Sequence, residues 1–267
     1  MEPTERIAVV REGLRDQYER YSQLVEGLED ASIPLPGSEW TIREAAVHVS
    51  GGPRRYGALV TGDVDLSNVL LDKKVLDARQ RSLIADNAET NLKRLADETR
   101  GSIEHFLKVT DGLPSDQPIA YYAGLRPTFG EMVPVLLGEP LVHGYDIASA
   151  AGRPWPIDQR YAALVVEAYR IFYPALFQPA AAGGLEASYR IDVPGTKPFV
   201  VRISEGTYEE LPAGTSVDCV ISMDPVTALL LATGRLSQWP AIALGRLTFS
   251  GDRPELGPRF VELFVFP

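Results

Sequence analysis

TFGEMVPVLLGEPLVHGYDIA, residues 128–148, predicts the long helix on which the first half of the fold depends. Thr128 and Glu131 have the spacing of a capping box, in which the hydroxyl accepts from the amide three residues on and the carboxylate reaches back. The apolar residues that follow at helical spacing extend the helix to a stop at Gly152. We therefore expect the apolar residues of this segment to face the interior of the protein. The polar residues among them, such as Glu139 and His143, then need an explanation.

Glu139 and His143 lie four residues apart in this helix and therefore project from the same face. The same spacing is common on solvated helix faces, but here the residues before and between the pair are apolar. The pair is therefore expected to be buried, and a buried carboxylate needs a partner. A metal ion would meet that need, and so would an arginine from elsewhere in the chain.

Pro140 stands between these two residues, where it removes one backbone hydrogen bond and clashes with the carbonyl of Leu136. We predict a kink in the helix at this point. The alternative is that two shorter helices meet at Gly138–Glu139. In both cases backbone is exposed beside Glu139.

A second capping box occurs earlier, in EWTIREAAVHVSGG, residues 39–52. Thr41 and Glu44 predict a helix that starts at Thr41, with Trp40 placed to act as a hydrophobic staple. Gly51-Gly52-Pro53 is expected to end this helix, because glycine and proline are poor helix formers.

His48 lies in this second helix, one turn before its predicted end. If the two helices are neighbours in a bundle, His48, Glu139 and His143 can meet in its core. Two imidazoles and one carboxylate suit zinc or another divalent metal ion, with one coordination position left open for water or substrate. Asp146, three residues after His143, can hold the second ring nitrogen of that histidine. A salt bridge from Asp146 to a neighbouring arginine or lysine fits its position equally well.

The composition is that of a globular protein of 267 residues, with 45% hydrophobic and 23% charged residues. Its 36 acidic and 26 basic residues give a net charge of −10, which disfavours nucleic acid and anionic membranes as partners. The N-terminal segment lacks the apolar core of a signal peptide, and no apolar run reaches the ~20 residues of a membrane-spanning helix. Cys219 is the single cysteine, so an internal disulfide is excluded and the cytoplasm is the expected compartment.

The pattern of apolar residues changes from helical periodicity to strand-like alternation near Pro179–Gly184, which we interpret as a hinge. Helical periodicity before the hinge predicts further helices at Ile7–Leu28, Asn91–Val109 and Gln159 to about Phe177. After the hinge, alternating segments predict strands at 188–193, 198–204 and 217–223, then a helix from Asp224-Pro225 and a last amphipathic helix. We therefore expect a helical metal-binding domain, residues 1–180, followed by a small α+β domain, residues 185–267.

Two segments together, EWTIREAAVHVSGG and GEPLVHGYDIASAAGRPWPI, resemble the mycothiol-dependent maleylpyruvate isomerase family of thiol-dependent metal enzymes. The segment DPVTALLLATGRLSQWPAIALGRLTFSGDRPEL is similar to that family's C-terminal domain, which is related to sterol carrier proteins. The resemblance spans nearly the whole chain in the expected order. It implies a DinB-like four-helix bundle, a sterol-carrier-like α+β domain, a zinc ion and the thiol mycothiol.

The resemblance maps the metal ligands of the family onto His48, Glu139 and His143. A thiol next to such a metal ion is deprotonated and becomes a nucleophile for isomerisation or S-transfer on a small electrophilic substrate. The resemblance also implies an arginine of the C-terminal domain that steadies the developing anion. Arg246 is the first candidate for this role and Arg235 the second, and each position also suits a helix-end or surface arginine.

Two other functions remain compatible with the sequence. One is a zinc enzyme of the same fold that activates water or a substrate oxygen without a thiol. The other is a non-catalytic carrier, in which the C-terminal domain binds an apolar small molecule. Metal content, dependence on a thiol and the effect of replacing the three ligands separate these functions, whereas no motif identifies the substrate.

Overall fold

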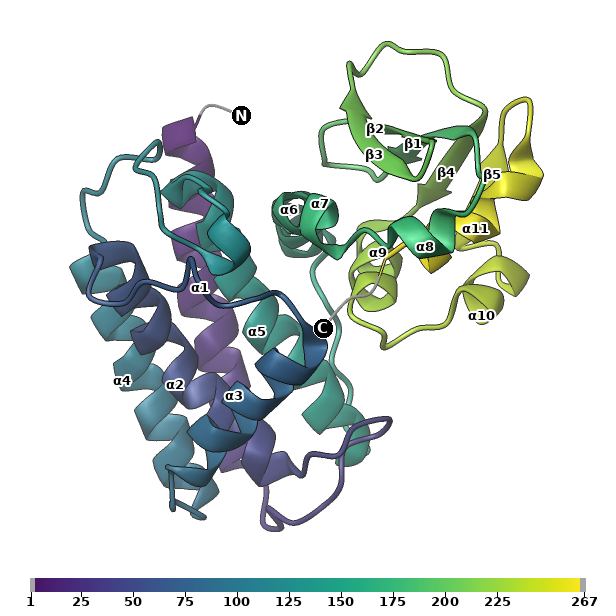
Figure 1. The fold of residues 1–267 in the computed structure, drawn as a ribbon. Helices are drawn as coiled ribbons and strands as arrows, with labels where there is room; N and C mark the ends of the chain where they lie inside the picture. The colour runs from purple at the N-terminus through teal and green to yellow at the C-terminus, as the bar shows by residue number, and fades with distance from the viewer. Residues whose placement is uncertain (1–2, 265–267) are drawn as a thin grey trace. The chain divides into compact units, whose positions relative to one another are not determined.

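The computed structural model describes residues 3–264, which form two compact units that divide between Ile157 and Asp158 (Figure 1). The first unit is helical, and the second combines helices with one mixed sheet. This order confirms the predicted class, a helical bundle followed by a small α+β domain.

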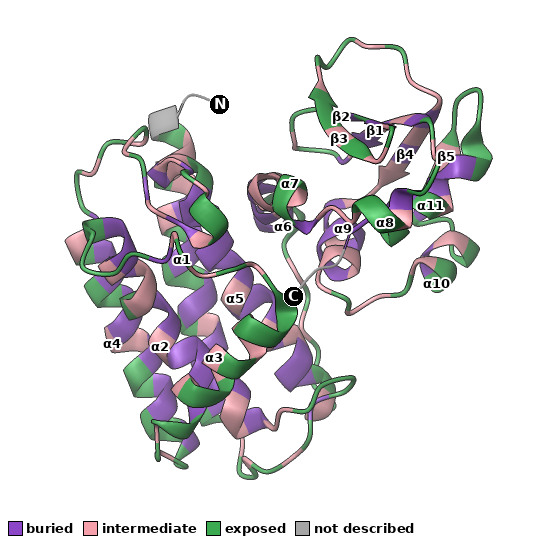
Figure 2. Cartoon of the chain, in the orientation of Figure 1, coloured by how far each residue is buried: buried purple, intermediate pink, exposed green. Residues whose placement is uncertain are grey.

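The first unit is a four-helix bundle with one additional helix. Its elements are α1 (Pro3–Glu26), α2 (Ile42–Thr61), α3 (Lys73–Ala85), α4 (Leu92–Val109), the 3-10 turn η1 (Tyr122–Gly124) and α5 (Phe129–Ala150). α1 packs against α4 and α5, and α2 packs against the same two helices. The facing sides of these helices are buried (Figure 2), with Leu14, Phe106 and Leu136 fully inaccessible.

Both predicted capping boxes are present. Thr41 precedes α2 and Thr128 precedes α5. Each hydroxyl accepts from the amide of the glutamate three residues on, Glu44 or Glu131, whose carboxylate accepts from the threonine amide. The two helices that carry the candidate ligands therefore begin where the sequence predicts.

The end predicted for α2 is wrong. The helix does not stop at Gly51-Gly52-Pro53 but continues to Thr61. Pro53 interrupts the backbone hydrogen bonds of the helix, and the amide of Arg54 donates instead to the hydroxyl of Ser102 in α4, at 3.1 Å. The packing of α2 on α4 therefore overrides the local stop signal.

α3 is a helix that the sequence pattern does not predict. Its sequence is strongly charged, and Ile84 is its buried residue, so it lacks the apolar periodicity on which helix prediction relies. Asp72 caps the helix by accepting from the amides of Lys74 and Val75. α3 packs on α2 and carries Gln80.

α5 is a single helix that contains both Pro134 and Pro140, so the alternative of two shorter helices meeting at Gly138–Glu139 is not realised. Pro140 has no amide hydrogen to donate to the carbonyl of Leu136. The hydroxyl of Tyr18 in α1 donates to that carbonyl instead, at 3.2 Å. A neighbouring helix thus supplies the hydrogen bond that the proline removes.

Replacing Tyr18 with phenylalanine is expected to lower the free energy of unfolding by about 1–2 kcal/mol, because the buried Leu136 carbonyl loses its partner. Tyr21 provides a matched control, since it is also fully buried on α1 but donates to the carbonyl of Ala45. That carbonyl keeps a helical partner, because Val49 has an amide hydrogen. Urea unfolding followed by circular dichroism should show a smaller loss for Tyr21→Phe, and the reverse order would contradict this role of Tyr18.

The second unit consists of one mixed sheet and the helices that accompany it. Its helices are α6 (Gln159–Ala168), α7 (Tyr173–Leu176), α8 (Pro179–Ala182), α9 (Pro225–Ala232), α10 (Gln238–Ala243) and α11 (Gly257–Glu262), with the 3-10 turns η2 (Tyr169–Phe172) and η3 (Pro254–Leu256). The strands are β1 (Ala187–Asp192), β2 (Phe199–Ser204), β3 (Thr207–Leu211), β4 (Cys219–Met223) and β5 (Leu247–Ser250), in the order β3-β2-β1-β4-β5. β1 and β4 are parallel, and the other neighbours are antiparallel.

Three features of the second half of the chain differ from expectation. The helix predicted from Gln159 to Phe177 is divided into α6, η2 and α7, and Pro174, which cannot donate to a helical ladder, lies at the start of α7. α6 packs against α9, so the division between the units precedes the segment 179–184 that we interpreted as a hinge. β3 was not predicted, because its sequence TYEEL is mostly polar and lies at an edge of the sheet.

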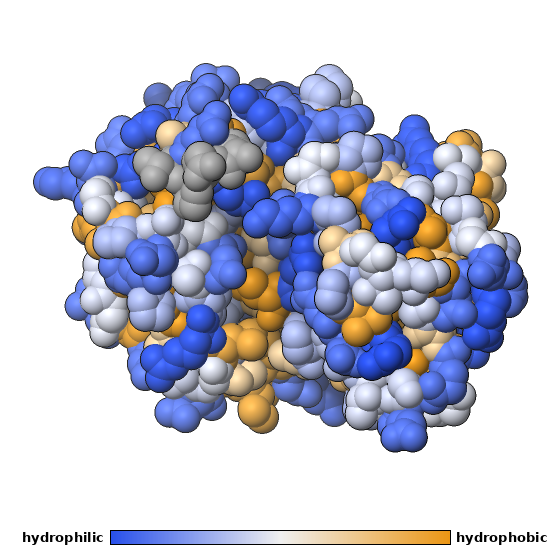
Figure 3. Space-filling model, turned by 90° about the horizontal axis from the view of Figure 1, so that it is seen from above, coloured by the Kyte–Doolittle hydropathy of each residue, from blue (hydrophilic) through white to orange (hydrophobic). Residues whose placement is uncertain are grey.

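Polar and charged residues cover much of the molecular face in Figure 3, as the composition leads one to expect. Among residues 3–264, no helix combines the length and the apolar character that crossing a membrane requires. Large apolar side chains exposed in the described part include Trp239 and Leu244, at and just after α10.

Candidate metal centre

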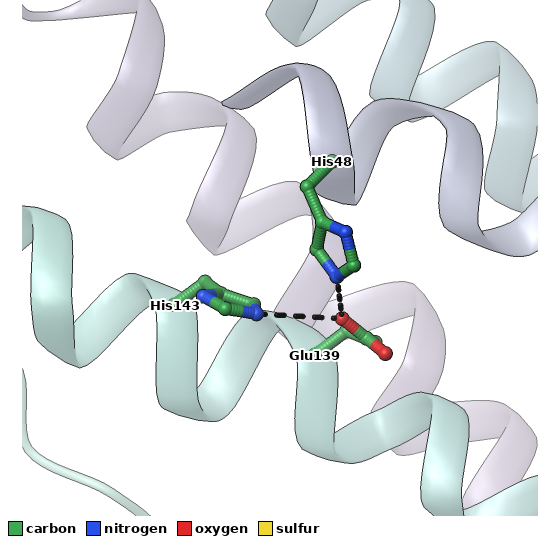
Figure 4. A group of neighbouring side chains, drawn as sticks. All are labelled: His48, Glu139 and His143. Atoms are coloured by element: carbon green, nitrogen blue, oxygen red, sulfur yellow. Dashed lines mark hydrogen bonds and ion pairs between the residues drawn. The ribbon is translucent and has the colours of Figure 1, made fainter. Parts of the chain in front are cut away.

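The structure brings His48 of α2 together with Glu139 and His143 of α5 (Figure 4). Nε2 of His48 lies 2.8 Å from Oε2 of Glu139, and Nε2 of His143 lies 3.6 Å from the same oxygen. One possible ligand atom from each residue lies within 4.8 Å of the other two. These three residues could hold one metal ion, and for brevity we call them the metal centre.

The separations between Glu139 and the two histidines fit a shared metal ion. Zinc–nitrogen and zinc–oxygen distances of ~2.0–2.2 Å in tetrahedral geometry place two ligand atoms ~3.3 Å apart. The two separations from Glu139, 2.8 and 3.6 Å, lie on either side of that value. Two imidazoles and one carboxylate are also a donor set of catalytic zinc sites, which keep a further position open.

Two residues of the metal centre, Glu139 and His143, have the charge states of metal ligands. Burial raises the pKa of Glu139, but His48, His143 and Arg55 outweigh it and bring the pKa down to about 2. Burial lowers the pKa of His143, so its ring is neutral near pH 7. An ionised carboxylate and a neutral imidazole are the forms that bind a metal ion.

Oxygen atoms outside the metal centre face the second nitrogen of each imidazole. Oε1 of Gln80 lies 3.0 Å from Nδ1 of His48. An amide oxygen only accepts, so Gln80 would hold the proton on Nδ1 when Nε2 of His48 binds a metal ion in place of its contact with Glu139. Oδ2 of the buried Asp146 lies 3.4 Å from Nδ1 of His143, which is the position anticipated for a supporting carboxylate.

Three side chains at this site were not assigned to it from the sequence. Trp40 was expected only to staple the start of α2, yet its ring lies against His48 and His143, with centroid distances of 5.1 and 5.8 Å. Gln80 was missed together with α3. Arg55 was missed because the predicted helix ended before it, although the alternative partner considered for Glu139 was an arginine of this kind.

The two candidate arginines of the C-terminal half both lie in the second unit. Arg246 is exposed between α10 and β5 and lines an open groove of about 710 Å³ together with Asp224 and Thr248. Arg235 is half-buried and donates to the carbonyl of Thr233 at 2.6 Å. Arg246 therefore has more freedom to meet a ligand, which favours it over Arg235.

Comparison with known proteins gives two family matches and one similar fold. The model of the mycothiol maleylpyruvate isomerase N-terminal domain matches residues 14–148, and that of the SCP-2 sterol transfer family matches residues 177–264. Solved structures of the mycothiol-dependent maleylpyruvate isomerase and of its histidine-to-alanine variant each align with a TM-score of 0.54 and 15% identity. Each alignment covers 94% of this chain and 93% of the other. No curated protein matches the sequence.

The first family match spans half of the chain and contains all three residues of the metal centre. The second family match covers the sheet of the second unit, in the order that the sequence resemblance implied. The similarity of fold extends over both units. The chain belongs to the mycothiol maleylpyruvate isomerase family, a family of enzymes.

Proposed function

We propose that the protein uses a low-molecular-weight thiol, mycothiol, and a zinc ion held by His48, Glu139 and His143 to isomerise a small electrophilic substrate or to transfer the thiol to it. The observation that supports this most strongly is the meeting of two imidazole nitrogens and one ionised carboxylate in a largely buried position. Family membership supports the choice of thiol and of reaction.

When bound, the zinc ion would supply the positive charge that lowers the pKa of a thiol and yields a thiolate near neutral pH. The residues of the chain prepare the site for that chemistry. Glu139 stays ionised, Gln80 would hold the Nδ1 proton of a metal-bound His48, and the ring of Trp40 lies against both imidazoles. Arg246 is proposed to steady the negative charge that develops on the substrate.

The proposal is tested by titrating the metal-free protein with zinc and then with mycothiol, and by measuring turnover of maleylpyruvate. We expect one zinc ion per chain, mycothiol binding that requires zinc, and turnover that requires both. A protein that takes up no divalent cation would exclude the proposal.

Other outcomes of the same experiment point to the alternative functions. Zinc binding without any response to mycothiol would indicate an enzyme that activates water or a substrate oxygen. Replacement of all three ligands without loss of function would indicate a small-molecule carrier.

The compartment that suits this function is a reducing one. A thiol cofactor must stay reduced, and Cys219 is buried as a free thiol in β4. We therefore propose the cytoplasm as the place of action.

A further inference from the structure

The backbone around Trp40 forms a short turn that fixes this residue just before α2 begins. The carbonyl of Trp40 accepts from the amide of Leu35 at 2.8 Å, and its amide donates to the hydroxyl of Ser38 at 3.1 Å. Gly37, within the turn, has a φ of 69°, a left-handed conformation that glycine adopts without strain. Thr41 then caps α2. Trp40 is therefore held by local hydrogen bonds, none of which involves a residue of the metal centre.

The indole ring of Trp40 contacts both imidazoles of the metal centre. It stacks on the ring of His143, with 27° between the planes and 5.8 Å between the centroids. It is tilted by 46° to the ring of His48, at a centroid distance of 5.1 Å. Because His48 belongs to α2 and His143 to α5, one side chain from the loop before α2 spans ligands of two helices. The indole ring therefore restricts the rotation of both imidazoles.

This position goes beyond the hydrophobic staple that the sequence predicts for Trp40. Any large apolar side chain can serve as a staple, whereas the face of an aromatic ring also carries partial negative charge. A metal ion draws electron density from the imidazoles that bind it, so both rings become more positive when the metal centre is loaded. A cation within ~6 Å of an indole centroid is attracted to the face of the ring. Both imidazoles lie within that distance of Trp40.

We propose that Trp40 is a positioning residue of the metal centre, whose indole ring orients both imidazoles for metal binding and stabilises the metal-bound form. The inference rests on the zinc site of the proposed function and assigns a role to a residue that is not itself a ligand. Restricted imidazoles lose less rotamer freedom when the metal ion binds. The attraction to the indole face also raises zinc affinity, because it is stronger in the loaded than in the metal-free state.

Two substitutions of Trp40 separate this role from that of a staple. Trp40→Leu keeps a large apolar side chain before α2 but has no aromatic face, whereas Trp40→Phe keeps an aromatic ring. Competition with a chelator should show a zinc affinity that is about tenfold lower in Trp40→Leu and closer to wild type in Trp40→Phe. The midpoints of thermal unfolding of the metal-free variants should lie close to that of the wild type.

Trp239→Leu is the matched control, because it removes an exposed tryptophan of the second unit and should leave zinc affinity unchanged. Wild-type zinc affinity in Trp40→Leu would overturn the proposal, since Trp40 would then act only as a staple. Equal losses of affinity in Trp40→Leu and Trp40→Phe would overturn it as well, because the aromatic face would then contribute nothing.

The fluorescence of Trp40 provides a readout that does not depend on the folding of Trp40→Leu. Zinc added to the wild-type protein should change the tryptophan emission in proportion to zinc occupancy, because the rings against Trp40 become more positive. The change should be largely lost in Trp40→Phe, which retains Trp155 and Trp239. Emission that does not respond while zinc binds would contradict a contact between the indole ring and the loaded metal centre.

The same measurements separate this inference from the proposed function. Zinc binding that is weakened in Trp40→Leu supports the role of Trp40 even if no thiol-dependent turnover is found. Thiol-dependent turnover of the wild type, together with unchanged zinc affinity in Trp40→Leu, overturns the role of Trp40 and leaves the proposed function intact. A wild-type protein that binds no divalent cation excludes both.

Discussion

Replacing His48 with alanine is expected to abolish stoichiometric zinc binding and, with it, any thiol-dependent turnover. The two remaining donors, Glu139 and His143, are both on α5, so α2 no longer contributes a ligand. Residues that merely orient a ligand affect metal affinity by about 10–100-fold, so loss of a ligand should weaken zinc binding by about 100-fold or more. The measurement is zinc per chain after dialysis at fixed free zinc, with the dissociation constant from competition with a chelator.

Two further variants, one beside the metal centre and one far from it, test whether the loss of zinc binding is specific to the metal centre. Gln80→Ala removes the acceptor at Nδ1 of His48 and should weaken zinc binding by about 10–100-fold, less than the loss of His48 itself. His105→Ala removes an exposed histidine of α4 and should leave zinc binding unchanged. A full complement of zinc in His48→Ala would mean that these three residues do not form the metal site.

The starts of the site helices could be predicted because they depend on local interactions. The hydroxyl of Thr41 and the carboxylate of Glu44 satisfy amides within the same turn, and the same holds for Thr128 and Glu131. The four-residue spacing on α5 likewise fixes which side chains share a face, whatever surrounds them. Features of this kind are encoded in a few consecutive residues.

Features that depend on contacts between elements were missed. α2 continues past Pro53, where Ser102 of another helix accepts from the amide of Arg54, whereas the local signals indicate a stop. Arg55 was missed for the same reason, because it lies beyond the end predicted for α2. Gln80 comes from a helix held by capping and by packing on α2 rather than by an apolar face of its own. Both side chains lie at the site, but Arg55 becomes a neighbour of His48 only because α2 continues, and Gln80 only because α3 packs on α2.

Replacing Gly144 with alanine is expected to destabilise the helical unit by about 1–2 kcal/mol. Gly144 follows His143 in α5, and a Cβ there would overlap the indole ring of Trp155. The ring cannot easily withdraw, because its Nε1 donates to the carbonyl of Leu141 at 3.0 Å and the guanidinium of Arg20 lies 3.8 Å from its centroid. Overpacking of this kind costs ~1–3 kcal/mol or more, which exceeds the ~0.5–1 kcal/mol that alanine gains over glycine in a helix.

Gly52→Ala is the matched control for this steric argument, because it places the same methyl group in the interior of another helix of the same unit. A Cβ at Gly52 meets no atom within 4 Å, so only the gain in helix propensity remains, and the free energy of unfolding should rise by up to ~1 kcal/mol. The two variants carry the same substitution, but the free energy of unfolding is expected to fall in Gly144→Ala and to rise in Gly52→Ala. Urea unfolding followed by circular dichroism measures this free energy in both. Zinc affinity should fall in Gly144→Ala, since a displaced Trp155 lets the turn that carries His143 shift, and should be unchanged in Gly52→Ala. If Gly144→Ala were as stable as the wild type, the close approach of α5 to Trp155 would not be needed to hold His143 in place.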